Sequence, residues 1–182
     1  EQQKLFGKAD FYSMDPFHEN GATGNIDFSK SGKAVMEAMK KVNPKAVWVI
    51  QGWTNNPRPA MIKDLKQGDL LILDLSSESC PMWGIPSIWK REKGYEQHDW
   101  VFCMLLNFGG NVGLHGRMDQ LLNHFYLTQN HPLTTRLKGI GLTMEGSENN
   151  PVMYELMCEL PWRPEKFTKE SWLKDYLFAR YG

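Results

Sequence analysis

Short apolar segments alternate with amphipathic stretches along this 182-residue chain. Continuous apolar runs with β-branched residues are typical of strands covered on both faces, which belong to parallel sheets. On this pattern we expect strands at 8–14, 46–50, 70–73, 100–106 and 139–143. Asp15-Pro16 ends the first of them, because proline cannot donate to a strand ladder.

The stretches between these strands predict helices. The first is expected to begin at Ser29 or Ser31 and to end at Asn43-Pro44. A segment of four consecutive charged residues, 90–93, is expected at the surface. Further helices are expected at 61–66, 118–127, from Asn150-Pro151 onward, and 171–181.

The order strand, loop, helix, repeated five times, predicts an α/β chain. An open doubly wound sheet and a piece of a (β/α)8 barrel both have this order. The G-x-G-x-x-G spacing that a dinucleotide-binding sheet carries after its first strand is absent. We favour the TIM-barrel type, because polar and aromatic residues follow strand after strand, where barrel enzymes build their sites. Since a closed barrel uses eight strands, we expect only the later five or so βα units, in one partial catalytic domain spanning 1–182.

Composition narrows the class of partner. A content of 41% hydrophobic residues suffices for one domain with a sizeable core. Lys+Arg and Asp+Glu both total 21, so no net field attracts nucleic acid or an anionic membrane, and we expect neither as a partner. No apolar run approaches the roughly 20 residues of a membrane span. Because the chain begins with Glu1, we expect further sequence upstream.

The residues give no sign of a cofactor. Cys80, Cys103 and Cys158 are an odd number without C-x-x-C spacing, and we expect buried free thiols rather than metal ligands. A phosphate-cradling loop, a nucleophile elbow and a cluster of carboxylates at metal spacing are all missing from the sequence. Hydrolysis that needs no cofactor is therefore the expected chemistry.

Two glutamates follow strand-like segments and suit glycoside cleavage. Glu19 stands in Asp-Pro-Phe-His-Glu after the first strand, and Glu145 stands in Thr-Met-Glu-Gly after the fifth. One carboxyl group would protonate a leaving oxygen while the other meets positive charge at a sugar carbon. If the strands are consecutive, the two face each other across a barrel, at a separation that permits retention or inversion. The simpler alternative makes Glu145 an acidic residue near the start of a helix.

Other residues at the strand ends are candidates for sugar contacts. An indole face can stack on the apolar side of a sugar ring, and Trp53, Trp83 and Trp89 lie in expected loops. Four other tryptophans, Trp48, Trp100, Trp162 and Trp172, are expected in the core. Covering a barrel end and making turns are the structural alternatives. The candidate substrate-binding residues are His18, Gln51, Trp53, Glu78, Trp83, Asn107 and Asn111.

Taken together, these segments resemble the alpha-N-acetylglucosaminidase family, glycoside hydrolase family 89. The similarity runs in family order through the segments 46–53, 71–75 with Glu78-Ser79, 107–111, and 144–146 followed by Asn149 and 152–154. The resemblance implies a (β/α)8 catalytic domain and a retaining double displacement that removes terminal alpha-linked N-acetylglucosamine from glycans. It places the acid/base on Glu19 and the nucleophile on Glu145.

The resemblance also predicts what lies beyond this chain. Family members carry an earlier barrel half, a small domain before it and a helical domain after the barrel. We therefore expect the missing barrel half upstream in the full-length chain, and a glycan with terminal N-acetylglucosamine as the substrate. One alternative is a non-catalytic carbohydrate-binding or scaffolding fragment of a truncated barrel. Another is a related barrel glycosidase that acts on a different sugar by inversion.

Overall fold

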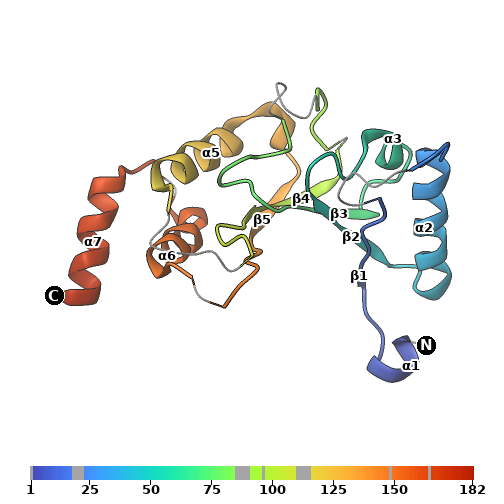
Figure 1. The fold of residues 1–182 in the computed structure, drawn as a ribbon, viewed down its shortest axis with the longest axis horizontal. Coiled ribbons are helices and arrows are strands. Elements are labelled where there is room, and N and C mark those ends of the chain that lie inside the picture. The colour runs from blue at the N-terminus through green and yellow to red at the C-terminus, as the bar shows by residue number, and fades with distance from the viewer. Residues whose placement is uncertain are drawn as a thin grey trace.

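A computed structural model describes residues 2–17, 23–84, 91–95, 97–109, 116–147, 149–163 and 165–182. Within these residues, five parallel strands form one sheet in the order β1-β2-β3-β4-β5 (Figure 1). Neighbours in sequence are neighbours in the sheet throughout, as in a (β/α) barrel, whereas a doubly wound sheet reverses its strand order. The predicted α/β class of barrel type is confirmed. The strands are β1 (Phe11–Ser13), β2 (Val47–Gly52), β3 (Leu70–Asp74), β4 (Asp99–Met104) and β5 (Leu137–Leu142).

The helices follow the predicted order, with one addition at the N-terminus. Asp27 caps α2 by accepting a 3.1 Å hydrogen bond from the Lys30 N–H, so the cap predicted at Ser29 or Ser31 is wrong. Pro151 opens α6, as predicted from the fixed φ of proline. The helices are α1 (Gln2–Phe6), α2 (Phe28–Val42), α3 (Pro59–Ile62), α5 (Met118–Asn130), α6 (Pro151–Glu159) and α7 (Lys169–Tyr181).

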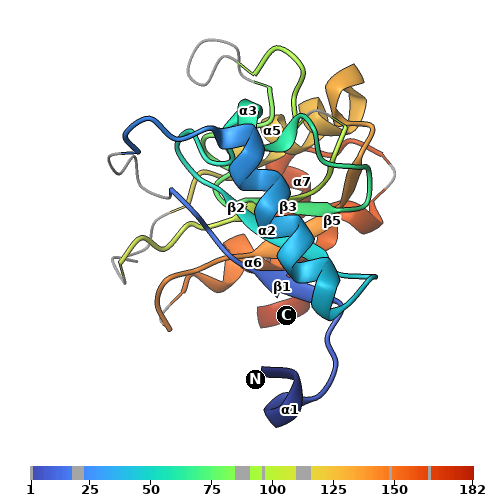
Figure 2. The same ribbon diagram turned by 90° about the vertical axis from the view of Figure 1, so that its right-hand side faces the viewer.

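The two faces of the sheet differ in burial. Trp48 and Ile50 of β2 are fully buried, whereas Val49 between them is only half-buried. Phe102 of β4 packs edge-on against Phe125 of α5, with the ring centroids 5.5 Å apart. Figure 2 shows α2 lying across the sheet on the face that it covers. Helices therefore cover one face, and the other face, which would line a barrel interior, is more open in this chain.

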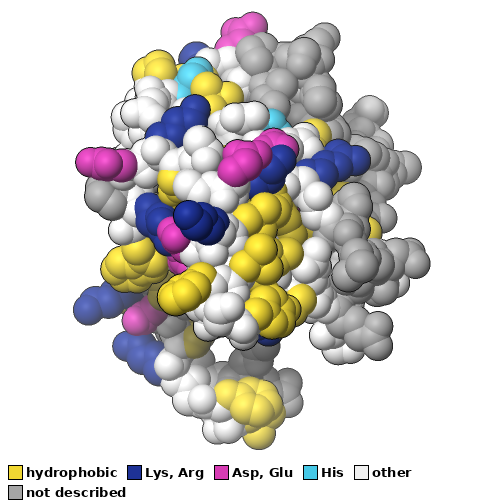
Figure 3. Space-filling view, turned by 90° about the vertical axis from the view of Figure 1, so that its left-hand side faces the viewer, with side chains coloured by type: hydrophobic (Ala, Val, Ile, Leu, Met, Phe, Trp, Pro, Cys, Tyr) yellow, Lys and Arg dark blue, Asp and Glu magenta, His cyan; other side chains and the backbone are white. Residues whose placement is uncertain are grey.

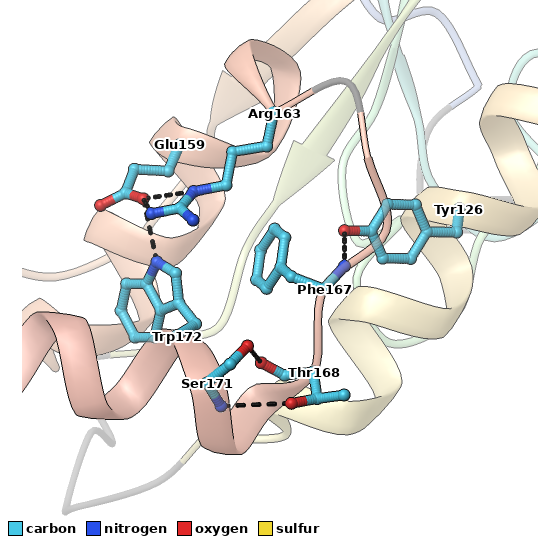
Figure 4. Close-up of polar contacts among 7 residues, drawn as sticks. All are labelled: Tyr126, Glu159, Arg163, Phe167, Thr168, Ser171 and Trp172. Carbon is cyan, nitrogen blue, oxygen red and sulfur yellow. Dashed lines mark hydrogen bonds and ion pairs between the residues drawn. The ribbon is translucent and has the colours of Figure 1, made fainter.

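Figure 4 shows how α7 is attached to the rest of the molecule. One carboxylate oxygen of Glu159 accepts hydrogen bonds from the Arg163 side chain at 2.7 Å and from the Trp172 indole at 3.0 Å. The Tyr126 hydroxyl accepts the Phe167 N–H at 3.3 Å. Towards the end of α7, Leu177, Phe178 and Tyr181 are exposed, and Figure 3 shows hydrophobic side chains gathered on this side of the molecule.

Three predictions about burial are wrong. Trp162 is 84% exposed, because it lies in a 3-10 turn after α6 and not in the core. Cys158 is exposed on α6, whereas Cys103 is buried as predicted. Arg91, from the segment expected at the surface, is buried because its guanidinium donates to the Pro57 carbonyl at 2.8 Å and lies over the Tyr95 ring.

Candidate active site

The carboxyl ends of β3, β4 and β5 are linked by hydrogen bonds between the loops that follow them. The Thr143 N–H donates to the Met104 carbonyl at 3.0 Å, and its hydroxyl donates to the Leu75 carbonyl at 2.9 Å. Residues that follow three different strands are thereby fixed at one edge of the sheet. In the barrel architecture this is the edge that carries the active site.

Glu145 is oriented by the loop that follows β4. Its N–H donates to the Asn107 carbonyl at 3.1 Å, and its Oε2 accepts the Gly109 N–H at 2.6 Å. The residue is exposed to solvent. The helix α6 begins only at Pro151, and its N-cap is Asn150. The contacts of Glu145 thus place its carboxylate at the strand ends, held at a defined angle, instead of against the first turn of α6.

Asn107 connects the loops after β4 and β5 with the start of α6. The residue is buried, and its Nδ2 donates to Asn149 Oδ1 at 3.2 Å. Tyr154 of α6 donates its hydroxyl to the same oxygen at 2.8 Å, and Asn149 Nδ2 donates to the Gly146 carbonyl. Burial, and after it the charge of Glu78, raises the pKa of Tyr154. The backbone on both sides of Glu145 is therefore held by a connected polar network.

Trp53 and Phe108 form an aromatic pair between the loops that follow β2 and β4. Their ring centroids are 6.1 Å apart at an interplanar angle of 43°, and both rings are partly exposed. Phe108 directly precedes Gly109, whose N–H holds the carboxylate. Sequence reasoning missed Phe108 as a candidate site residue. The available signal is an aromatic residue inside the Asn-Phe-Gly-Gly loop. The prediction for this loop uses only its polar residues and its glycines.

Asp15 anchors the Asp-Pro-Phe-His-Glu segment at the end of β2. Its Oδ1 accepts the Gln51 N–H at 2.6 Å, and the preceding Met14 carbonyl accepts the Trp48 indole N–H at 2.7 Å. Gln51 is half-buried and lies two residues after the half-buried Val49, so both are on the more open face of the sheet. The candidates His18, Glu19 and Asn111, together with the loop residue Trp89, lie outside the described residues.

Comparison with known proteins identifies the family of the chain. The family model described as the alpha-N-acetylglucosaminidase (NAGLU) tim-barrel domain matches residues 1–164. The chain belongs to this family. The resemblance expected from the strand-end motifs is confirmed.

Human alpha-N-acetylglucosaminidase is a relative with 32% identity over 191 residues, which covers 98% of this chain and 25% of the human protein. The family 89 glycoside hydrolase of Clostridium perfringens in complex with PUGNAc has a TM-score of 0.85 at 33% identity. It covers 100% of this chain and 20% of that chain. A Clostridium perfringens variant with two Glu→Gln substitutions, in complex with its substrate GlcNAc-alpha-1,4-galactose, has a TM-score of 0.84 at 31% identity. The chain thus spans a quarter or less of the length of these relatives.

Trp83 does not belong to the candidate site of this alpha-N-acetylglucosaminidase-family barrel. It is 2% exposed, and its ring lies 6.1 Å from Trp100, near the amino end of β4, and 4.8 Å from His131. The prediction that its ring stacks on a sugar is therefore wrong. The cause is Asp74, whose Oδ2 accepts the N–H groups of Met82 and Trp83 at 2.8 and 3.0 Å and folds the loop inward.

Two buried carboxyl groups support the loop after β3 in this barrel. Burial raises the pKa of Asp74 to about 7, although hydrogen bonds from Met82 and the charge of Arg91 act in the opposite direction. Burial likewise raises the pKa of Glu78, which the Leu106 N–H opposes by donating to it. One oxygen of each carboxyl group accepts hydrogen bonds from the main chain of this family barrel, at Met82 and Trp83 for Asp74 and at Leu106 for Glu78.

A cavity of about 590 Å³ lies elsewhere, between α2 and the turn before β3. Its lining includes Lys33, Lys40 and Asp69, at the amino end of the strands, so it is separate from the candidate site of the family barrel. In the described part of the chain, no group of three or more His, Cys, Asp or Glu residues is placed to hold a metal ion. No helix among the described residues is both long and apolar enough to cross a membrane.

Proposed function

We propose that this chain is the later part of the catalytic barrel of a retaining exo-glycoside hydrolase that removes terminal alpha-linked N-acetylglucosamine from glycans. The observation that carries the proposal is the carboxylate of Glu145, held at the strand ends by Asn107 and Gly109 within a barrel of this family. The name of the human relative and the substrate in the Clostridium perfringens complex support this choice of sugar. That complex also carries two Glu→Gln substitutions, which supports a mechanism with two glutamates.

In the proposed mechanism Glu145 is the nucleophile and Glu19 the acid/base. Glu19 protonates the glycosidic oxygen while a carboxylate oxygen of Glu145 bonds to the anomeric carbon, so the aglycone leaves as an alcohol. Glu19 then deprotonates a water molecule that attacks the same carbon and releases Glu145 as the carboxylate. The bond from the Gly109 N–H fixes the angle of the attacking group, which lowers the entropy cost of the first step.

The proposed sugar contacts lie in the loops and strand ends at the carboxyl side of the sheet. Trp53 and Phe108 offer the aromatic faces, and Gln51, at the end of β2, offers an amide group. Asn107 is buried and donates to Asn149, so in this proposal it acts by holding Glu145 through its carbonyl. His18 and Asn111 remain proposals for sugar contacts. No cofactor takes part in this mechanism.

The nucleophile is tested by Glu145→Ala in the full-length protein, with an aryl alpha-N-acetylglucosaminide as substrate. We expect turnover to fall by roughly a thousandfold or more, as for removal of a covalent nucleophile. Glu155→Ala is the matched control, because Glu155 lies on α6 and its ion pair with Arg180 is solvent-exposed. Unchanged turnover in Glu145→Ala would reject the assignment. The anomer formed first, read by NMR, separates retention from the inverting alternative.

The acid/base role is tested by Glu19→Ala on substrates with different leaving groups. Poor leaving groups require protonation, so their hydrolysis should slow far more than that of activated aryl glycosides. Equal losses on both kinds of substrate would contradict the role of Glu19 as the acid.

The exposed outermost strands of the sheet support a second proposal, which concerns what completes the barrel. Phe11 of β1 and Leu142 of β5 are exposed, and these are the outermost strands of the described sheet. We propose that further barrel strands, upstream in the full-length chain, pair with these edges. A clean monomer with low dye binding in equilibrium sedimentation of the 182-residue chain would weaken the related alternative of a scaffolding fragment that associates with a partner.

A further inference from the structure

The side chain of Glu78 reaches from the loop after β3 into the turn after β4. Glu78 is 4% exposed, and its Oε1 accepts the Leu106 N–H at 3.0 Å. Its own carbonyl oxygen lies 3.1 Å from Nδ1 of His124 on α5, and Gln120 of the same helix donates to the Ser79 carbonyl at 2.8 Å. The main chain at Glu78 and Ser79 is therefore held by α5, and the Oε1 of Glu78 is directed at the Leu106 N–H.

The turn that receives this bond has an unusual backbone. Leu106 has a φ of +51°, in the left-handed region that leucine rarely adopts. The next N–H, that of Asn107, donates back to the Leu105 carbonyl and closes a tight turn. Such a conformation persists only where surrounding contacts hold it, and the buried carboxylate of Glu78 supplies one.

The same turn leads directly to the two groups that orient Glu145. The Asn107 carbonyl accepts the N–H of Glu145, and the Gly109 N–H donates to its Oε2. A continuous series of contacts thus runs from Glu78 through Leu106 and Asn107 to the carboxylate of Glu145.

We propose that Glu78 is a positioning residue that sets the angle of the Glu145 carboxylate through the turn at Leu106 and Asn107, and does not itself contact the sugar. This inference rests on the proposed role of Glu145 as nucleophile. It replaces the direct sugar contact predicted for Glu78 from its place after a strand. Glu78 also borders a cavity of about 320 Å³ that Phe108 and Arg117 help to line, so contact with a ligand is the alternative to be separated.

Two substitutions in the full-length protein separate the effect of the length of the Glu78 side chain from the effect of its charge. Glu78→Gln keeps the length of the side chain and an oxygen that accepts the Leu106 N–H, but it removes the charge. Glu78→Asp keeps the charge, but it is one methylene too short to reach the turn. Each variant is compared with wild type by kcat and KM on the aryl glycoside, and by hydrogen exchange of peptides that cover 105–109 and 143–147.

A positioning role predicts that Glu78→Gln retains kcat within about threefold and leaves exchange in both peptides unchanged. Glu78→Asp should lower kcat by about 30- to 100-fold with KM within about threefold, and should speed exchange in both peptides. Two results would overturn the inference: unchanged exchange at 105–109 in Glu78→Asp, or a rise in KM in Glu78→Gln that matches the rise in Glu78→Asp. The second result would make Glu78 a substrate contact.

The failure of this inference differs from the failure of the proposed function. If Glu145→Ala abolishes turnover while Glu78→Asp loosens both peptides at full kcat, the nucleophile stands and the positioning role falls. If Glu145→Ala keeps its turnover, the proposed function falls. In that case the exchange data alone still decide whether Glu78 holds the turn. Faster exchange of the 105–109 peptide in Glu78→Asp, but not in Glu78→Gln, would show that it does.

Discussion

The N–H of Gly109 donates a 2.6 Å hydrogen bond to Oε2 of Glu145, from a backbone with a φ of +59°. Glycine adopts this left-handed conformation at no steric cost, whereas other residues meet a clash between Cβ and the backbone. Among the described residues other than its chain neighbours, no atom lies within 4 Å of the position that a Cβ would take at Gly109. The residue is thus required here for its backbone angle, which aims the N–H at the carboxylate.

Gly109→Ala should therefore act on catalysis through the backbone. The strain of about 1–2 kcal/mol favours a shift of the loop, and a shifted N–H no longer fixes Glu145. We expect kcat to fall by about 10- to 100-fold, measured on an aryl alpha-N-acetylglucosaminide. Gly68→Ala is the matched control, because Gly68 also has a positive φ, +88°, and open space, but it lies in the turn before β3. A kcat that falls equally in both variants would contradict this role of Gly109.

The two tryptophans after β2 and β3 should respond differently to the same substitution. Trp53→Ala removes a partly exposed ring that pairs with Phe108, so we expect KM to rise by about three- to tenfold with little change in stability. Trp83→Ala removes a buried ring from the core and should lower the free energy of unfolding by about 3–5 kcal/mol. Denaturant unfolding and steady-state kinetics of both variants check this pair. A large loss of stability in Trp53→Ala would show that its ring is structural.

The raised pKa of Asp74 should make stability depend on pH in one direction. Burial raises this pKa from 3.8 to about 7 in the folded protein. Between about pH 4 and 7 the folded protein keeps a proton that the unfolded chain has lost, so the contribution of Asp74 to the free energy of unfolding falls as pH rises. Below this window the carboxyl is protonated in both states, and above it the carboxyl is ionised in both.

Asp74→Asn removes this titration. We therefore expect the free energy of unfolding of the variant, minus that of wild type, to increase as pH rises from 4 to 7 and to stay constant above pH 7. Urea unfolding at each pH measures this difference. Asp64→Asn is the control, because hydrogen bonds from Ser29 and Lys33 lower the pKa of the exposed Asp64. The contribution of Asp64 to the free energy of unfolding therefore changes with pH in the opposite direction to that of Asp74. Parallel pH profiles for wild type and Asp74→Asn would show that Asp74 titrates normally.

Sequence pattern was a good guide to the strands and a poor one to the loops. The apolar runs at 46–50 and 70–73 mark β2 and β3 almost to the residue, because continuous apolar side chains are typical of strands in the parallel sheet of a barrel. The loop after β3 could not be predicted, because its path depends on two long-range bonds from Asp74 to the main chain at Met82 and Trp83. The pattern therefore predicts Trp83 at the sugar, whereas its ring lies in the core.

The candidate site shows the same limit. Glu145 was found because it follows a strand and precedes a glycine, both of which are local signals. The role of Glu78 in holding Leu106 was not visible, since the two residues are 28 positions apart and meet only through a buried carboxylate. Contacts between side chain and backbone across strands carry no sequence period, so pattern reasoning cannot find them.

Gly32 of α2 gives a last test, in which helix propensity and packing predict opposite signs. Replacement of glycine by alanine inside a helix usually stabilises by about 1 kcal/mol. At Gly32, however, an added Cβ would lie 2.1 Å from the Met61 carbonyl oxygen of α3, and a backbone atom cannot move aside cheaply. We expect Gly32→Ala to lower the free energy of unfolding by about 1–3 kcal/mol. Glu37→Ala, at an exposed position of the same helix, should change it by less than about 0.5 kcal/mol. A more stable Gly32→Ala protein would show that α2 and α3 do not pack this closely.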